Sequence, residues 1–267
     1  MEGQLVKAEC TANWLTLTLD RPAARNALSN ALIETLIERL REAAVDLSIR
    51  GITLRGAGQV FCAGGDIKEF AAVNADVHGA LERVYADSIR TGELLRIVAE
   101  QPQPVVAAVH GAAIAGGLGL MAAADFVITA ADTRFALTET RLGIVPAQIA
   151  PWVAARTGNT VAKRLMLSGR RFNSTEAKTY GLIDWLVDQE SDLDHQVADV
   201  RREILRCAPG ANRRTKQLMR SLTSGVSDEQ IANAATAFTD ALTSDGGRQG
   251  MEGVLQRKAR AWSPQDR

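Results

Sequence analysis

Cysteine is scarce in this chain of 267 residues. Its three copies, Cys10, Cys62 and Cys207, follow neither the spacing of a disulfide framework nor that of a metal site. The sequence also lacks a cluster of metal ligands and a flavin-binding fingerprint, so we expect no metal and no bound cofactor. The simplest interpretation of the cysteine pattern is a reducing compartment, and we predict a cytoplasmic protein.

An excess of charge of either sign is also missing, because 31 basic residues balance 31 acidic ones. No global field therefore draws the chain towards nucleic acid or an anionic membrane. The first ten residues carry two glutamates and no apolar core, which is unlike a signal peptide or a transit peptide. We predict a soluble protein with neither a nucleic-acid nor a membrane partner.

One uncharged run, Val105 to Ala124, is long enough to raise the question of a membrane span, which needs about 20 apolar residues. The run consists mainly of Ala and Gly and is interrupted by His110 and Gly111. We interpret it as a buried strand, a turn and a helix.

Hydrophobic periodicity predicts alternating strands and helices. Leu15 to Leu19 alternates as a half-buried strand does, and Ser29 is placed to cap a helix over Leu32 to Leu40. Further strands are expected at 51–55, 104–109, 126–128 and 134–136, with 104–109 buried on both faces. Further helices are expected at 78–100, 116–124, 160–168, 174–180, 192–207, 215–222, 228–242 and 250–262. The pattern favours an α/β core over residues 1–195 and a C-terminal α-helical extension over 196–267.

Two glycine-rich segments carry the candidate chemistry. Phe61 to Glu69 reads FCAGGDIKE, and His110 to Gly119 reads HGAAIAGGLG. We interpret each as a strand, a glycine turn and a helix start, where free N–H groups suit an anion or a developing oxyanion. Simple structural explanations also exist: Asp66 would cap a helix, and the second segment would allow close helix packing. Two such turns together are what an oxyanion hole with two amide donors requires.

Other enzyme classes fit the residues less well. Gly56, Gly58 and the second glycine cluster are out of spacing for the GxGxxG turn of a dinucleotide-binding fold. A hydrolase with Cys62 or a serine as nucleophile lacks the GxSxG elbow. His110 sits in a turn with no evident partner, and we expect it to be structural.

Five segments in chain order resemble the enoyl-CoA hydratase/isomerase family, or crotonase superfamily. They are Leu19–Leu28 (LDRPAARNAL), Phe61–Glu69, Pro104–Asp125, Phe135–Pro146 (FALTETRLGIVP) and Leu167–Ile183. The resemblance implies a spiral of ββα units followed by C-terminal helices that assemble the chain into a homotrimer or a dimer of trimers. It also implies an acyl-CoA substrate, with coenzyme A as part of that substrate rather than a separate cofactor.

The resemblance further assigns site residues. The amides of Gly65 and Gly116 would form the oxyanion hole, and Glu139 would be the acid/base. Coenzyme A would be bound by Arg25, Ala63, Asp66, Ile67, Lys68, Gly117, Arg257 and Lys258. We expect burial beside Ile144 and Val145 to raise the pKa of Glu139.

One departure from the family pattern bears on the reaction. The hydratases of the family use two glutamates, and the position of the first is occupied here by Gly119. With Glu139 alone, a proton shuttle that moves a 3-enoyl double bond to the 2-position is the simpler chemistry. Hydration of a 2-enoyl-CoA, including branched or terpenoid glutaconyl-CoA, stays open, with Glu139 and Gln148 holding the water. Asp125 is expected to be structural.

A non-catalytic CoA- or RNA-binding member of the family is a further alternative, although neutral charge and the presence of Glu139 favour an enzyme. The acyl chain itself is not predicted, because its pocket depends on the mutual positions of several side chains. These are Phe70, Val73, Tyr85, Ile114 and Trp152.

Overall fold

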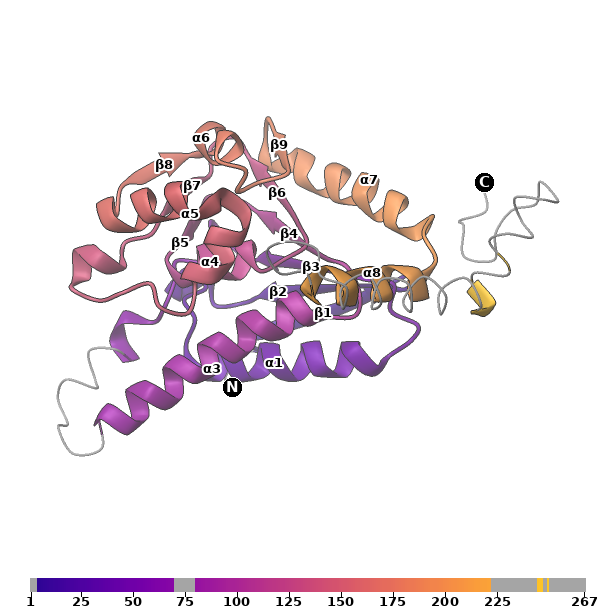
Figure 1. Cartoon of the computed structure of the whole chain (residues 1–267), viewed down its shortest axis with the longest axis horizontal. Helices are drawn as coiled ribbons and strands as arrows, with labels where there is room; N and C mark the ends of the chain where they lie inside the picture. The colour runs from indigo at the N-terminus through magenta and orange to yellow at the C-terminus, as the bar shows by residue number, and fades with distance from the viewer. Residues whose placement is uncertain (1–3, 70–79, 222–243, 247–248, 250–267) are drawn as a thin grey trace, which may run out of the picture.

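The structure, a computed structural model, describes residues 4–69, 80–221, 244–246 and 249 (Figure 1). Several predicted features lie outside these ranges: the helices at 228–242 and 250–262, the CoA ligands Arg257 and Lys258, and the pocket residues Phe70 and Val73. Among the described residues, no helix is both long enough and apolar enough to cross a membrane.

Two sheets form the core of the fold. The larger has the strand order β1 (Val6–Thr11), β2 (Trp14–Leu19), β3 (Gly51–Gly56), β4 (Val105–Val109), β6 (Phe126–Ala130) and β9 (Trp185–Val187). The first pair is antiparallel and every other neighbouring pair is parallel. The smaller sheet has the order β5 (Ala112–Ile114), β7 (Arg134–Ala136) and β8 (Arg171–Asn173). Strands of the two sheets alternate with helices along the chain, which is the crotonase-like spiral that the resemblance implied.

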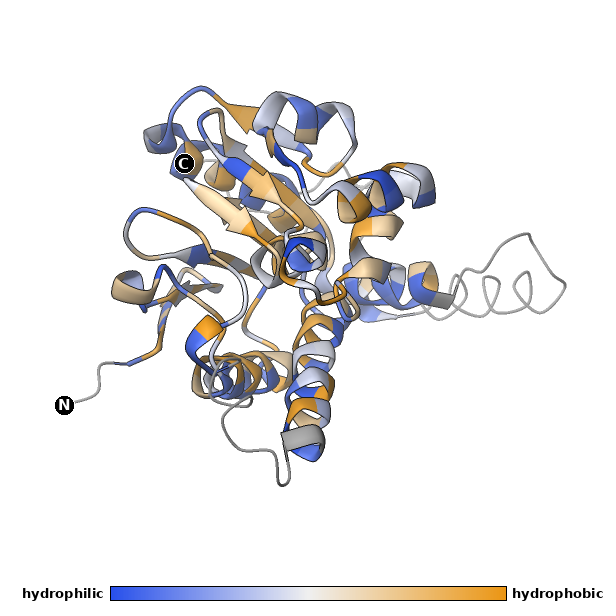
Figure 2. Cartoon of the chain, turned by 90° about the vertical axis from the view of Figure 1, so that its left-hand side faces the viewer, coloured by the Kyte–Doolittle hydropathy of each residue, from blue (hydrophilic) through white to orange (hydrophobic). Residues whose placement is uncertain are grey.

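The helices cover both faces of the larger sheet (Figure 1). They are α1 (Asn30–Val45), α3 (Ala80–Glu100), α4 (Gly116–Ala122), α5 (Ala150–Ser168), α6 (Ser174–Thr179), α7 (Leu193–Leu205) and α8 (Pro209–Ser221), with 3-10 turns η1 (Pro22–Ala24), η2 (Glu139–Leu142) and η3 (Glu190–Asp192). The central strands are mainly apolar, whereas the helices carry both polar and apolar residues (Figure 2).

Alternation along β4 shows why its sequence is apolar throughout. Val105 and Ala107 belong to the main core cluster, which includes side chains of α1 and α3. Val106 points to the other face, where it joins Trp14 and residues of α7. The prediction of a strand buried on both faces is therefore confirmed.

Most predicted elements are present, and their caps explain their ends. The Ser29 side chain accepts a hydrogen bond from the Leu32 N–H, as predicted, and so satisfies a free donor at the start of α1. The α5 helix begins ten residues earlier than predicted, because the sequence signal is interrupted at Gly158, where φ is +73° inside a kinked helix. Four strands, β1, β5, β8 and β9, were not predicted.

One sequence interpretation needs correction, and the predicted division at residue 195 stays a prediction. Phe61 to Gly65 is not a strand, because its backbone bonds in turn to several partners: Cys62 bridges to Ala113, whereas Gly65 bridges to Leu28. The division at residue 195 falls inside α7. Leu193 and Val200 of that helix pack in the second core cluster, so its residues on both sides of the division cover the sheet.

Candidate active site

The first glycine turn is held by the segment that follows β2. The Ala63 N–H donates to the Arg25 carbonyl at 3.0 Å, and the Leu28 N–H donates to the Gly64 carbonyl at 2.7 Å. Gly64 has a φ of +98°, a backbone angle that favours glycine. Asn26 is fully buried and its Nδ2 donates to the carbonyls of Ala57 and Val60. These contacts fix the backbone that leads into Gly65.

Arg21 fastens the same turn from the side. Its guanidinium donates to the Ala27 carbonyl at 2.6 Å and forms a 3.0 Å ion pair with Asp66. Asp66 also accepts the Lys68 N–H at 3.0 Å, and it is 8% exposed. Although burial opposes ionisation, these hydrogen bonds and the Arg21 charge lower the pKa of Asp66. The capping explanation for Asp66 fits these contacts, whereas contact with coenzyme A stays a prediction.

The second glycine turn is strained just before Gly116. Ala115 has φ +49° and ψ −121°, which is a sparsely populated conformation for a residue with a Cβ. The Ala115 N–H donates to the Ala136 carbonyl at 2.8 Å, so the turn is tied to β7. This geometry sets the direction of the next N–H group, that of Gly116, at the start of α4.

The two turns lie against each other. A Cβ atom placed on Gly64 would lie 2.9 Å from the Ala115 Cβ and 3.5 Å from the Gly116 nitrogen, and one placed on Gly116 would lie 3.7 Å from the Gly65 nitrogen. Among the described residues, no hydrogen bond joins the N–H of Gly65 or Gly116 to an acceptor. Both glycines are partly exposed. Two neighbouring, free and accessible amide donors are the arrangement that stabilises an oxyanion.

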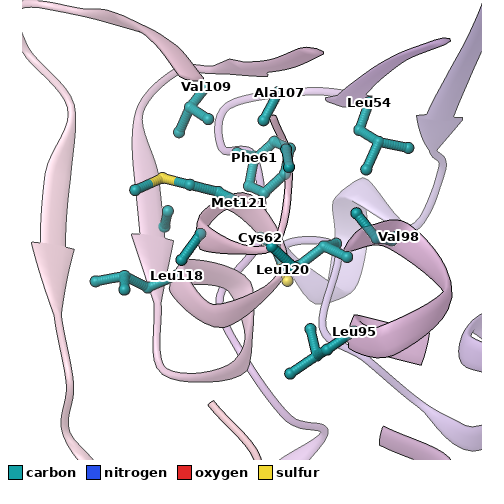
Figure 3. Packing of buried hydrophobic residues seen from close by; sticks show 14 of the residues in the cluster. Leu54, Phe61, Cys62, Leu95, Val98, Ala107, Val109, Leu118, Leu120 and Met121 are labelled. Atoms are coloured by element: carbon teal, nitrogen blue, oxygen red, sulfur yellow. The ribbon is translucent and has the colours of Figure 1, made fainter. Parts of the chain in front are cut away.

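A common core supports both turns from behind. Phe61 and Cys62 of the first turn pack among Leu118 and Met121 of α4 (Figure 3). Gly117 is buried, and a Cβ there would lie only 2.5 Å from the Cys62 carbonyl oxygen. Gly117 therefore allows close packing of α4 against the first turn. Contact of Gly117 with coenzyme A stays a prediction.

Cys62 itself is unsuited to nucleophilic chemistry. Its side chain is fully buried, and burial raises the pKa of the thiol to about 12. It therefore stays protonated at neutral pH, and the hydrolase alternative loses its cysteine nucleophile. His110 is also buried and its Nε2 hydrogen-bonds the Gly58 carbonyl, in keeping with the structural role expected for it.

Glu139 lies three residues after the end of β7 and begins η2. It is 8% exposed, and its Oε2 is buried with no hydrogen-bond partner in the described part of the chain. Burial is the main influence on this carboxyl and raises its pKa, as predicted. Burial beside Ile144 and Val145 was the predicted cause of this shift. These two side chains are themselves 46% and 73% exposed, so they are not the main source of the burial. A buried carboxylate with an unused oxygen is suited to take a proton.

Gly119 faces a filled space rather than an open one. A Cβ at this position would lie 2.3 Å from Cγ2 and 2.7 Å from Cβ of Ile149, which is 4% exposed. A glutamate at 119 therefore does not fit unless Ile149 moves. The sequence showed that the first carboxylate is missing. It did not show that Ile149 fills the space, because Ile149 is 30 positions further along the chain.

Gln148, predicted as a second group for holding water, has another partner. Its Nε2 donates to the Ser88 Oγ at 3.1 Å, and its Oε1 lies against Gly92 of α3. Asp125 is structural, as expected: its Oδ2 accepts the Val105 N–H at 2.7 Å and pairs with Lys216.

The remaining predicted CoA ligands lie around the first turn. Ala63 is partly exposed, while Ile67 and Lys68 are exposed. Arg25 lines a cavity of about 540 Å³ on the outer face of the small sheet, next to Ile114 and Thr138. These two residues adjoin Ala115 and Glu139, so the cavity lies beside the glycine turns without including them. In the described ranges, no group of three His, Cys, Asp or Glu side chains is placed to hold a metal ion.

Known proteins resemble this chain in both sequence and fold. The model of the enoyl-CoA hydratase/isomerase family matches residues 9–265, and the chain belongs to that family. The 1,2-epoxyphenylacetyl-CoA isomerase of Escherichia coli K12 is 32% identical over 200 residues, which are 72% of this chain and 71% of the relative.

A hydratase is about as similar to this chain as that isomerase is. The 2,3-dehydroadipyl-CoA hydratase of the same organism is 30% identical over 245 residues, which are 91% of this chain and 92% of the relative. The solved structure of AtuE from Pseudomonas aeruginosa superposes with a TM-score of 0.92 at 37% identity, covering 98% of this chain and all of that one.

Proposed function

We propose that the chain isomerises a 3-enoyl-CoA thioester to the 2-enoyl-CoA. The Glu139 carboxylate removes a proton from C2, and the electron pair moves into the thioester carbonyl to give a dienolate. The N–H groups of Gly65 and Gly116 donate hydrogen bonds to its oxygen. Glu139 then returns the proton to C4, which leaves the double bond between C2 and C3 and the thioester unchanged.

The observation that carries this proposal is the buried Glu139 carboxylate, together with two neighbouring amides that have no acceptor among the described residues. Glu139 has an unpartnered oxygen, and the wall at Gly119 is closed by an isoleucine instead of a second carboxylate. One group that takes a proton and gives it back needs no partner, and it works best with a pKa raised towards neutrality.

Hydration of a 2-enoyl-CoA is the second candidate, because a relative at 30% identity is named as a hydratase of 2,3-dehydroadipyl-CoA. Glu139 would then both activate the water and deliver the proton. The existing hydrogen bond from Gln148 to Ser88 weighs against Gln148 as the water's second partner.

Parallel assays of the whole chain test the proposal. The chain is incubated with a 3-enoyl-CoA and, separately, with the matching 2-enoyl-CoA, and both double-bond migration and 3-hydroxyacyl-CoA formation are followed. We expect migration to exceed hydration in kcat/KM. Hydration that is faster than migration would overturn the isomerase proposal in favour of the hydratase. If neither occurs, both are wrong for these substrates, and malonyl- or glutaconyl-type thioesters are the next to assay.

The predicted trimer or dimer of trimers, and the binding of the CoA phosphates by Arg257 and Lys258, are part of the same proposal. Their support is the family pattern in the sequence. Light scattering on the purified chain measures the assembly directly.

A further inference from the structure

The face of α4 that carries Gly116 also carries Gly119, because residues three positions apart in a helix lie on the same side. Whatever occupies the space above Gly119 is therefore part of the wall next to the second oxyanion donor. Ile149 occupies that space, and its contact with position 119 is so close that no side chain beyond hydrogen fits.

Ile149 is held in this place from two directions. It precedes α5, and its carbonyl accepts the Val153 N–H at 3.2 Å. The residue before it, Gln148, is bonded to Ser88 of α3. The segment between Glu139 and Ile149 is also tied to its own start, because the Ile144 N–H donates to the Glu139 carbonyl at 3.1 Å. The start of α5 is thus tied to α3 through Gln148, and it touches α4 where Ile149 meets Gly119.

This wall offers nothing to a water molecule. A buried water needs about two to four polar partners. Gly119 and Ile149 contribute no polar side-chain atom, and the Gly119 N–H is already bonded to the Ala115 carbonyl at 3.1 Å. With a thioester oxygen on the two amides, the Glu139 Oε2, which has no partner among the described residues, would be left to meet a water.

We propose that Ile149 is a specificity-determining residue: it keeps water out of the corner beside Gly119, so that Glu139 returns its proton to carbon instead of adding water or exchanging with solvent. The inference rests on the proposed proton transfer by Glu139. It deepens that proposal by naming the residue that favours proton return to carbon over hydration and over exchange with solvent.

Isomerisation in D₂O tests this directly. The wild-type chain converts a 3-enoyl-CoA, and mass spectrometry measures how much of the proton removed from C2 reappears at C4. We expect substantial protium retention in the wild type. In Ile149→Ser, retention falls and the ratio of hydration to migration rises by about tenfold, which is the scale on which small changes in a pocket alter discrimination.

The matched control is Leu167→Ser, which shortens an exposed apolar side chain on the same helix and leaves both quantities unchanged. A folded Ile149→Ser protein with wild-type retention and wild-type product ratio would overturn the role of Ile149 while leaving the isomerase proposal intact. Absence of migration in the wild type would count against the proposed function and, with it, against this role.

A cycle of variants tests the packing claim without any turnover. Gly119→Ala is expected to lower the melting temperature by several degrees in the wild-type background and to have little effect in Ile149→Gly, where both close side-chain atoms, Cβ and Cγ2, are gone. Equal losses in both backgrounds would show that Ile149 does not fill the position, and would refute the inference on structural grounds.

Discussion

At the scale of single residues, Glu139 combines a cost in stability with a use in chemistry. Its carboxyl is buried, and desolvation raises its pKa above the usual value for glutamate. A carboxyl with a raised pKa in the folded state favours folding while it is protonated, at low pH. This contribution is lost as the pH rises through the raised pKa. The charged form, which takes the proton in the proposed reaction, is therefore the form that destabilises the fold.

Glu139→Gln should remove this penalty, because a neutral amide does not have to ionise in the same place. We expect the variant to be more stable than the wild type at pH 7 to 8, with a difference that shrinks as the pH falls towards the ordinary pKa of a glutamate, about 4.3. Urea unfolding across this range measures the effect. Glu203→Gln, at an exposed position on α7, is the control and should show no such trend. A Glu139→Gln protein less stable than the wild type at every pH would contradict this account.

Prediction at this scale succeeded where the signal was local. The Ser29 cap depends on a residue three positions away, and the turn position of His110 was readable from its neighbours. Arg21 and Ile149 were missed, because their partners Asp66 and Gly119 are 45 and 30 positions away in the sequence. A single sequence carries no measure of such distances in space.

At the scale of elements, the start of α4 is the most constrained part of the site. Ala115 is strained, and Gly117 is pressed against the turn that contains Cys62. Because α4 carries one proposed oxyanion donor and Cys62 leads to the other, we expect the contact at Gly117 to set how closely the two amides approach.

Gly117→Ala should therefore push the two turns apart. We expect a loss of about 1–3 kcal/mol in unfolding free energy, typical of overpacking a tight core, together with a lower kcat. Thermal or urea unfolding and a turnover assay measure the two effects. Gly210→Ala near the start of α8 adds the same methyl group beside a flexible arginine, and should be neutral or slightly stabilising. Wild-type stability and kcat in Gly117→Ala would mean that the contact does not set the donor geometry.

Short strands limited what could be predicted for the elements. The strands β5 and β8 have three residues each, which is too few for an alternating pattern to stand out. The first glycine turn was taken for the end of a strand because Phe61 and Cys62 are apolar; their burial comes from the core behind the turn, as Figure 3 shows.

At the scale of the whole molecule, a partly buried ion pair fastens the C-terminal part of the described chain to the core. Lys216 of α8 lies 2.5 Å from the Asp125 carboxylate and also donates to the Gln103 carbonyl. Burial raises the pKa of Asp125 and lowers the pKa of Lys216, and the attraction between the two charges opposes both shifts.

Lys216→Met should leave Asp125 buried without its counter-ion and cost roughly 2–4 kcal/mol of stability. Adding Asp125→Asn removes the orphaned charge and should restore part of the loss, as urea unfolding of the single and double variants would show. Lys163→Met, at an exposed position on α5, is the matched control. A loss no larger than that of Lys163→Met would argue that the pair does not hold α8 in place.

The overall fold was predicted from the order of its sequence segments, whereas single elements were predicted from local patterns. Five family-like segments in order carry the strand–turn–helix units, and their arrangement implied the spiral that the structure has. The division at residue 195 stays a prediction; it falls inside α7, whose apolar side chains Leu193 and Val200 pack against the sheet. Assembly and a cytoplasmic location remain predictions, since neither depends on contacts within one described chain.

The central claim is that Glu139 alone carries the proton, and the most direct measurement is the turnover of Glu139→Gln on a 3-enoyl-CoA beside that of the wild type. We predict a fall in kcat of about 10²- to 10⁴-fold, the usual contribution of a general base, with an unchanged dissociation constant for the substrate. Undiminished turnover in the folded variant would contradict the account.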